Sequence, residues 1–323
     1  MTVIAPAPPH AVATSVGTIA FHDQGEGPPV LLLHGFPASS WQWREFVPLL
    51  ASRFRVIAPD LVGSGASMPA DGARLDLVAH ATSMRELLQH LGVERCAVVA
   101  HGTGAGLAQM LALETDAVEA LVLLAAASFD AWPGPGVVRA RERLRAEGCS
   151  SELVRSIVRR AFEAGAMHRE RLPDDVLDAY AEPYAVGEGP DRFMRVLEGL
   201  DGRGLVGREA ELAAIEAPVL IMWGEEDPVF PPSVAERLND AMPSSTLGLL
   251  PGCGHFLVEE APDTIGPMIS EYLRARYSQS PHGHDDPKAG VVMLQLERRP
   301  PWVDVEEYER DEWFDHEKSD PSP

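Results

Sequence analysis

Short apolar runs alternate with stretches of helical spacing over the first 125 residues. The apolar runs, which are typical of buried parallel strands, cover 30–33, 56–58, 96–100 and 118–125. Between them, apolar residues recur with the period of a helix over 41–53, 77–91 and 107–113. Because strands that alternate with helices pair in parallel, this part of the chain predicts an α/β fold with a doubly wound, mostly parallel sheet.

The alternation stops after residue 128 and resumes near residue 214. From 129 to 213, segments rich in arginine and glutamate follow one another with helical spacing and without a convincing strand. Apolar runs return at 219–223 and 246–250, and a last helix is predicted over 262–277. We therefore expect a core formed by 17–128 and 214–277, a helical cap formed by 129–213, and a loose leader over 1–16.

Residues 278–323 differ in composition from the rest of the chain. They hold twelve acidic residues, five basic residues and six prolines, a composition that favours disorder. We expect this acidic C-terminal tail to be solvated and partly disordered. The apolar residues within 291–297 leave open an edge strand or the binding of a protein partner.

The charge balance and the lysine count exclude several classes of function. Acidic residues outnumber basic ones, 49 against 27, for a formal net charge of −22. Nucleic acids and anionic membranes bind basic surfaces, so neither is an expected partner. The two lysines, Lys288 and Lys318, lie near the C-terminus. The main body therefore lacks a lysine for Schiff-base or P-loop chemistry, and we expect no cofactor.

The cysteines and the N-terminus predict a cytoplasmic protein. The three cysteines lie far apart and are odd in number, which does not suggest a disulfide framework. The first residues show no signal peptide, and no apolar stretch has the length of a membrane span.

Residue 102 is the most informative position for chemistry. The segment 98–108 predicts a buried strand, a tight turn and the first turn of a helix, which is the context of a nucleophile elbow. The residue at the turn is Gly102. Glycine tolerates the backbone angles of such a turn, but it cannot form a covalent intermediate with a substrate.

Five short motifs stand in an order that is typical of one superfamily. They are HGFP at 34–37, DLVGSGAS at 60–67, AHGTGA at 100–105, GEED at 224–227 and GCGHF at 252–256. With them, residues 17–277 apart from the cap resemble the α/β-hydrolase superfamily, particularly its branch of epoxide hydrolases and dehalogenases. The resemblance implies an α/β-hydrolase fold with a helical cap insertion. It also places Gly102 where the family carries Ser, Asp or sometimes Cys, so the nucleophile position is vacated.

The resemblance implies roles for four further residues. His255 is expected to be the general base, and Asp227 is expected to orient it and to stabilise its charged form. The backbone N–H groups of Phe36 and Thr103 are expected to form an oxyanion hole. Haloalkane dehalogenases bind halide with Asn and Trp at the places of Phe36 and Thr103, so halide release is not expected here.

Five other residues are candidates for contact with a substrate: His34, His101, Trp43, Tyr180 and Tyr184. In epoxide hydrolases, cap tyrosines activate the ring oxygen, and the two tyrosines lie in the predicted cap. Core packing is the alternative interpretation for them.

Three weaker signals point to other chemistry. Glycines at 102, 104 and 106 suggest dinucleotide binding, but Leu107 breaks the G-x-G-x-x-G spacing. Thr103, Cys253, Ser64 and Ser67 are substitute nucleophiles. Thr103 should point along its helix, which favours the oxyanion role, whereas packing is favoured for Cys253 and turn formation for Ser64 and Ser67. Metal-capable side chains at 282 and 284–286 lie in a segment that reads as a polar linker, so we expect no metal site.

The sequence therefore predicts a base without a covalent nucleophile. Such a site suits proton abstraction next to a carbonyl or direct activation of water. We expect a cofactor-free enzyme that acts on a small, largely apolar organic substrate by elimination, cyclisation, isomerisation or direct hydration. Two alternatives stay open: a non-catalytic binding protein, and a nucleophile-knockout variant of an epoxide hydrolase or esterase.

Overall fold

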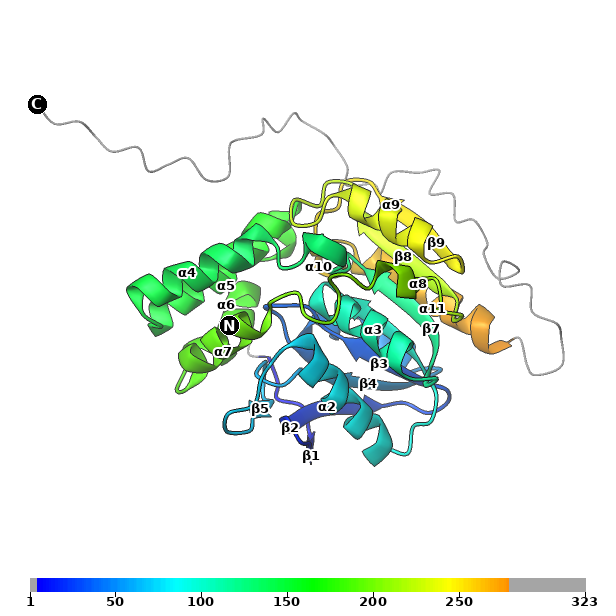
Figure 1. Ribbon diagram of the computed structural model, residues 1–323, viewed down its shortest axis with the longest axis horizontal. Helices are drawn as coiled ribbons and strands as arrows, with labels where there is room; N and C mark the ends of the chain where they lie inside the picture. Colours follow the sequence, from blue (N-terminus) through cyan, green and yellow to red (C-terminus); the bar gives the residue numbers. More distant parts are fainter. Residues whose placement is uncertain (1–4, 279–323) are drawn as a thin grey trace, which may run out of the picture.

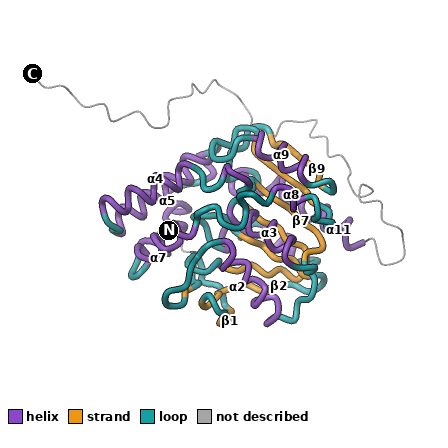
Figure 2. Tube along the Cα trace, viewed as in Figure 1, coloured by secondary structure: helices purple, strands orange, loops and turns teal. Residues whose placement is uncertain are grey.

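A computed structural model describes residues 5–278. Its strands form one twisted sheet between layers of helices (Figure 1 and Figure 2). The strands are β1 His10–Ala13, β2 Gly17–Gln24, β3 Pro29–Leu33, β4 Arg55–Pro59, β5 Met68–Pro69, β6 Cys96–His101, β7 Val118–Leu124, β8 Val219–Gly224 and β9 Ser245–Leu250.

The sheet is parallel over six strands and antiparallel at one edge. Its order is β1-β2-β4-β3-β6-β7-β8-β9, with β5 paired to β2. The strands from β4 to β9 in this order pair in parallel, whereas β1, β2 and β5 pair antiparallel. The chain order reverses around β3, as in doubly wound folds. The predicted fold class is thereby confirmed.

The helices cover both faces of the sheet. Their bounds are α1 Phe46–Leu50, α2 Leu77–His90, α3 Thr103–Glu114, α4 Pro135–Glu147, α5 Ser151–Gly165, α6 Asp174–Ala185, α7 Gly189–Gly199, α8 Glu209–Leu212, α9 Pro232–Ala241, α10 Leu257–Glu260 and α11 Pro262–Ser278. Helices α1 and α11 contact each other on one face, and α2, α3, α8 and α9 cover the other. Two apolar clusters lie between the sheet and these layers. Within residues 5–278, no helix is long and apolar enough to cross a membrane.

Two predicted segments need correction. The leader over 1–16 was expected to be loose, but β1 lies within it and pairs with β2. The side chains of β1 are mostly exposed, so the segment has no apolar run from which a strand could be predicted. The helix predicted over 41–53 is instead a 3-10 turn at Ser40–Trp43 followed by α1. Pro48 explains the break, because its ring clashes with the carbonyl four residues earlier in a continuous helix.

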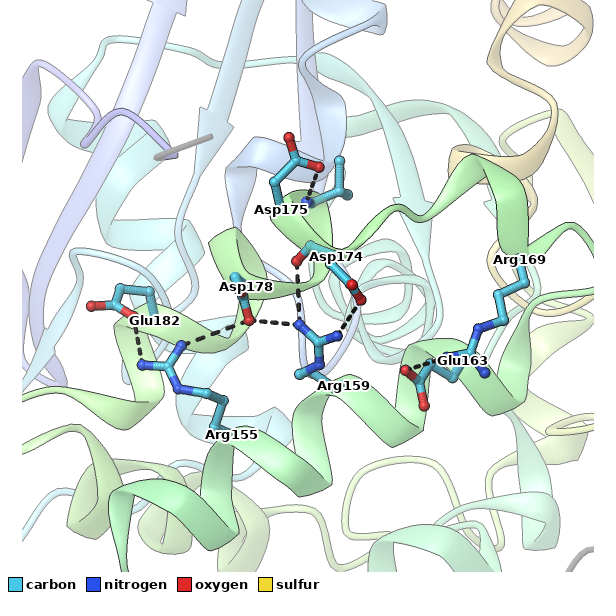
Figure 3. Close-up of polar contacts among 9 residues, drawn as sticks. Arg155, Arg159, Glu163, Arg169, Asp174, Asp175, Asp178 and Glu182 are labelled. Carbon is cyan, nitrogen blue, oxygen red and sulfur yellow. Dashed lines mark hydrogen bonds and ion pairs between the residues drawn. The ribbon is translucent and has the colours of Figure 1, made fainter. Parts of the chain in front are cut away.

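Helices α4 to α7 gather beside the sheet, between β7 and β8 in the chain (Figure 1). Figure 3 shows that α5 and α6 are joined by ion pairs. Arg155 contacts Glu182 at 2.6 Å, and Arg159 contacts both Asp174 and Asp178, the latter at 2.6 Å. Because these groups are partly exposed, each pair contributes at most about 1 kcal/mol. The ion pairs therefore fix the alignment of the two helices more than they stabilise the cap.

Gly104, which follows the elbow, is required for packing, and Gly106 lies at a second close contact. A Cβ on Gly104 would lie 2.5 Å from the carbonyl oxygens of Leu33 and His34. A Cβ on Gly106 would lie 2.8 Å from Leu205 Cδ1. Helix α3 can approach β3 this closely only with glycine at position 104. The glycine pattern thus has a structural cause that requires no dinucleotide.

Candidate active site

The predicted catalytic residues lie in loops that follow parallel strands. Gly102 follows β6, Asp227 follows β8 and His255 follows β9, while Phe36 lies in the loop after β3. Because the carboxyl ends of parallel strands meet at one edge of a sheet, the fold brings these loops together. That edge is where α/β sheets bind their ligands.

His255 and Asp227 form a buried hydrogen-bonded pair. His255 Nδ1 lies 2.9 Å from Asp227 Oδ2, so Nδ1 donates and Nε2 is left as the acceptor. Asp227 Oδ1 accepts hydrogen bonds from the amides of Val229 at 2.8 Å and Phe230 at 2.9 Å. The two side chains are only 6% and 0% exposed. The carboxylate is therefore held by three donors and fixes the orientation of the imidazole.

Gly102 has the geometry of a nucleophile elbow. Its φ of 55° and ψ of −120° are angles that L side chains rarely adopt. A Cβ at this position would lie 3.6 Å from His255 Nε2 and 3.5 Å from Gly35 Cα. A side chain on residue 102 would therefore point at the accepting nitrogen of His255. The backbone keeps the geometry for a nucleophile although the side chain is absent.

Phe36 and Thr103 contact each other directly. The Phe36 amide, expected to be an open oxyanion donor, instead donates to Thr103 Oγ1 at 2.9 Å. Thr103 was expected to point along its helix, but its hydroxyl reaches across to the loop after β3. That expectation is wrong, because the Thr103 hydroxyl accepts the hydrogen bond of the part-buried Phe36 amide. In accepting this bond, Thr103 Oγ1 keeps its own hydrogen for donation.

His34 and His101 have structural roles in place of the expected contact with a substrate. His34 Nδ1 donates to the Gly35 carbonyl at 2.9 Å, and Nε2 accepts from the Leu61 amide at 2.9 Å. His101 Nε2 donates to the His255 carbonyl at 2.9 Å, and Nδ1 accepts from Gln42 at 3.0 Å. Both rings are buried with both nitrogens used, so the two histidines orient loops.

Gln42 was missed by the sequence reasoning. Its Oε1 accepts from the Gly35 amide at 3.2 Å, and its Nε2 donates to His101. A chain of hydrogen bonds thus runs from the loop after β3, through Gln42 and His101, to the backbone of His255. No sequence signal marks this role, because Gln42 and His101 are 59 positions apart.

Three buried histidines should make the protein sensitive to mild acid. Burial lowers the pKa of His34, lowers that of His80 to about 4 and lowers that of His101 to about 3. In the unfolded chain these groups bind protons below a pKa of about 6.5. Their contribution to stability is therefore full above pH 6.5 and is lost as pH falls, by up to about 1.4 kcal/mol per pH unit for His80 and for His101.

Denaturant unfolding at several pH values between 7 and 5 measures this effect. We expect the free energy of unfolding to fall over this interval. His101→Gln should reduce the slope of the unfolding free energy against pH by the amount that corresponds to about one proton. Gln89→Asn, at an exposed position on α2 that does not titrate, should leave that slope as it is. If the free energy of unfolding of the wild type did not change between pH 7 and pH 5, the proposed effect of the buried histidines would be contradicted.

Trp43 belongs to the core and not to the site. It is fully buried in the apolar cluster between the sheet and helices α1 and α11, and its ring packs edge-on against Phe46 at 5.5 Å. The aromatic residues around His255, such as Phe230 and Phe256, belong to the other cluster. The expectation that Trp43 contacts a substrate is wrong, because its side chain lies on the opposite face of the sheet.

The hydroxyl groups of the two cap tyrosines attach the cap to the core. Tyr184 donates to Ser64 Oγ at 2.8 Å. Tyr180 donates to the buried carboxylate of Glu259, which also holds Arg44 through two hydrogen bonds of 2.8 and 2.6 Å. Because both hydroxyls have protein partners, the structure favours packing over the activation of a substrate oxygen for Tyr180 and Tyr184.

Glu260 joins the segment after α5 to the loop that holds His255. This fully buried carboxylate accepts hydrogen bonds from the amides of Gly254, Met167 and His168. The next residue in the loop, His255, donates its own amide to the Gly165 carbonyl at 2.7 Å. Burial raises the pKa of Glu260 despite these three donors. Glu259 and Glu260 are both buried, and only the structure shows their partners.

The substitute nucleophiles are not activated. Burial raises the pKa of the Cys253 thiol to about 12, so the reactive thiolate is scarce. Ser64 accepts from Tyr184, and Ser67 Oγ donates to the Asp60 carbonyl at 2.7 Å. Within the described part of the chain, neither serine is hydrogen-bonded to His255. The structure therefore favours packing for Cys253 and turn formation for Ser64 and Ser67.

The predictions about the acidic C-terminal tail and about a metal site remain. The acidic tail, with its possible strand and partner-binding segment, lies outside residues 5–278, as do the metal-capable side chains at 282 and 284–286. Within residues 5–278, no three His, Cys, Asp or Glu side chains are grouped so that they could hold a metal ion.

Comparison with known proteins agrees with this architecture. Residues 28–262 match the family model described as the alpha/beta hydrolase fold. Haloalkane dehalogenase 2 of Mycobacterium tuberculosis (strain ATCC 25618 / H37Rv) is 31% identical over 274 residues, which cover 80% of this chain and 92% of the relative. The magnesium-chelatase 30 kDa subunit of Rhodobacter capsulatus is 32% identical, with coverage of 77% and 87%. An α/β hydrolase fold protein from Burkholderia ambifaria superposes with a TM-score of 0.74 at 28% identity, with coverage of 83% and 98%.

Proposed function

Because this chain belongs to the α/β-hydrolase superfamily, in its dehalogenase- and epoxide-hydrolase-like branch, we propose that it is an enzyme that works without a covalent nucleophile. In this proposal His255 is the general base and Asp227 orients it. One observation carries the proposal: the complete base pair faces an elbow residue that has no side chain.

The base can act directly on a substrate or on water. His255 Nε2 removes a proton from a carbon next to a carbonyl, and the electron pair of the C–H bond moves onto the carbonyl oxygen to form an enolate. A positioned base of this kind contributes about 10²- to 10⁴-fold. Return of the proton to another atom completes an isomerisation, and loss of a leaving group completes an elimination.

Thr103 is the proposed anchor for the developing oxyanion. It is the first residue of α3, whose N-terminus carries the partial positive charge of the helix. Its backbone N–H and its hydroxyl, which is polarised by the Phe36 amide, are two donors at one residue. The Phe36 amide thus contributes to the oxyanion site through Thr103.

The residues around the base favour a small, largely apolar substrate. The rings of Phe230 and Phe256 pack edge-on against His255 at 5.2 and 5.1 Å. The ring of Phe36 stacks on Phe193 of the cap at 5.3 Å. Aromatic side chains with few polar groups select apolar molecules. A ketone with one apolar group is therefore a suitable probe.

Exchange of the α protons of phenylacetone in D₂O, followed by NMR, tests this function. Asp227→Asn should lower the catalysed exchange rate by on the order of 10²-fold or more, because an amide can hold the imidazole in the wrong tautomer. Asp240→Asn, an exposed position on α9, is the matched control and should exchange at the wild-type rate. Equal rates in Asp227→Asn and the wild type would exclude the proposed roles.

A further inference from the structure

The corner at Gly102 still has room for one heavy atom. A Cβ on Gly102 would meet two atoms within 4 Å, Gly35 Cα and His255 Nε2, both at ordinary contact distances. At Gly35, by contrast, a Cβ would lie 2.8 Å from His101 Nδ1, and at Gly224 it would lie 2.2 Å from the Cys253 carbonyl. Glycine is required by packing at those two positions. The neighbours of Gly102 have not closed over the nucleophile position.

Two independent features make this corner suitable for a small polar molecule. Gly102 is the N-cap of α3, a helix of 12 residues, and no side chain caps that end. The second feature is His255 Nε2, which belongs to a side chain that is only 6% exposed and has no hydrogen-bond partner within residues 5–278. A molecule here would meet the positive end of a helix and a proton acceptor together.

We propose that the corner at Gly102 binds a small external nucleophile, of the size of water or hydroxylamine, in the place of the missing side chain. This inference rests on the proposed function, because it needs His255 as the base. It adds a second activity, the transfer of an acyl group from an activated ester to that nucleophile.

The transfer has two balanced steps. First, His255 Nε2 takes a proton from the nucleophile, and the oxygen or nitrogen atom of the nucleophile forms a bond to the ester carbon. At the same time the carbonyl π electrons move onto the carbonyl oxygen. Second, that oxygen reforms the double bond, the bond to the leaving oxygen breaks, and the proton on Nε2 passes to the leaving group. Water gives an acid, and hydroxylamine gives a hydroxamate. No covalent bond to the protein forms.

Hydroxylamine with p-nitrophenyl acetate tests the proposal in the wild-type protein. After subtraction of the uncatalysed reaction, we expect the rate of hydroxamate formation to saturate with hydroxylamine concentration, because a site that binds the nucleophile can be filled. A rate that rises linearly with hydroxylamine would overturn the proposal. This measurement needs no variant.

Gly102→Ala gives a second test, because its methyl group occupies the proposed site. We expect the half-saturating concentration of hydroxylamine to rise by about tenfold or more, the loss that corresponds to one well-placed heavy atom. Gly92→Ala is the matched control, since Gly92 has a similar φ of +63° with nothing within 4 Å of the added carbon. It should saturate as the wild type does. Unchanged saturation in Gly102→Ala would overturn the proposal.

The two hypotheses fail in different ways. If proton exchange depends on Asp227 while hydroxamate formation is linear in hydroxylamine, the proposed role of His255 as the base is retained and the proposed nucleophile site is excluded. If proton exchange is independent of Asp227, the proposed role of His255 as the base is excluded.

Discussion

Replacement of His255 by glutamine should lower the catalysed exchange of phenylacetone protons by about 10²- to 10⁴-fold, to near the uncatalysed rate. The loss follows from chemistry, because a side-chain amide cannot take up the proton that Nε2 accepts. Glutamine is preferred to alanine in this test because its amide N–H can still donate to Asp227, which is buried and would otherwise lose one of its three donors.

Stability and a second histidine separate the catalytic role from a structural one. His255→Gln should keep a cooperative unfolding transition, because the aromatic packing of Phe230 and Phe256 remains. His90→Gln, far from the site on α2, should exchange protons at the wild-type rate. If His255→Gln retained full activity, another group would have to be the base.

Replacement of Gly102 by serine should create covalent catalysis. The new Cβ would lie 3.6 Å from His255 Nε2, so rotation about the Cα–Cβ bond can place the hydroxyl within hydrogen-bond range of the base. Loss of a nucleophile from a serine hydrolase costs on the order of 10⁶-fold in turnover. Recovery of a part of this factor should raise the hydrolysis of p-nitrophenyl acetate by about 10²-fold or more.

The same substitution should lower the stability of the protein. A serine at φ 55° and ψ −120° occupies a sparsely populated conformation, which costs about 1 to 3 kcal/mol. Glycine at this position therefore stabilises the fold while it removes the nucleophile. Denaturant unfolding of Gly102→Ser against the wild type measures the difference.

Intact-mass measurement after treatment with diethyl p-nitrophenyl phosphate identifies the covalent step. Gly102→Ser should gain one diethylphosphoryl group, because the activated hydroxyl displaces nitrophenolate. Gly102→Ala has the same backbone strain without a hydroxyl, so it should gain neither the adduct nor the ester hydrolysis. Absence of the adduct from Gly102→Ser would mean that His255 does not activate a group at this corner.

The amino-acid sequence by itself determined the fold class and the two residues that are proposed as the base pair. Alternating apolar runs and helical spacing are local properties, and the structure confirms the parallel sheet that they predict. His255 and Asp227 were expected from the resemblance to the α/β-hydrolase superfamily, and the structure places them 2.9 Å apart because parallel strands bring their following loops to one edge. The glycine at position 102 was equally visible, since it is one position in a recognisable turn.

Only the tertiary structure decided what the neighbouring side chains do. His34 and His101 were candidates for contact with a substrate, but in the structure both ring nitrogens of each have hydrogen-bond partners within the protein. Trp43 lies on the opposite face of the sheet from the base, and the period of its short helical turn could not show this. The bond between Phe36 and Thr103 joins residues 67 positions apart.

These roles share a physical reason. A secondary structure element follows from contacts between residues that are close in the chain, whereas a hydrogen-bond partner or a packing face depends on how distant segments meet. Gly102 illustrates both sides. The sequence shows that its side chain is missing, and only the folded chain shows that the space beside His255 has stayed open.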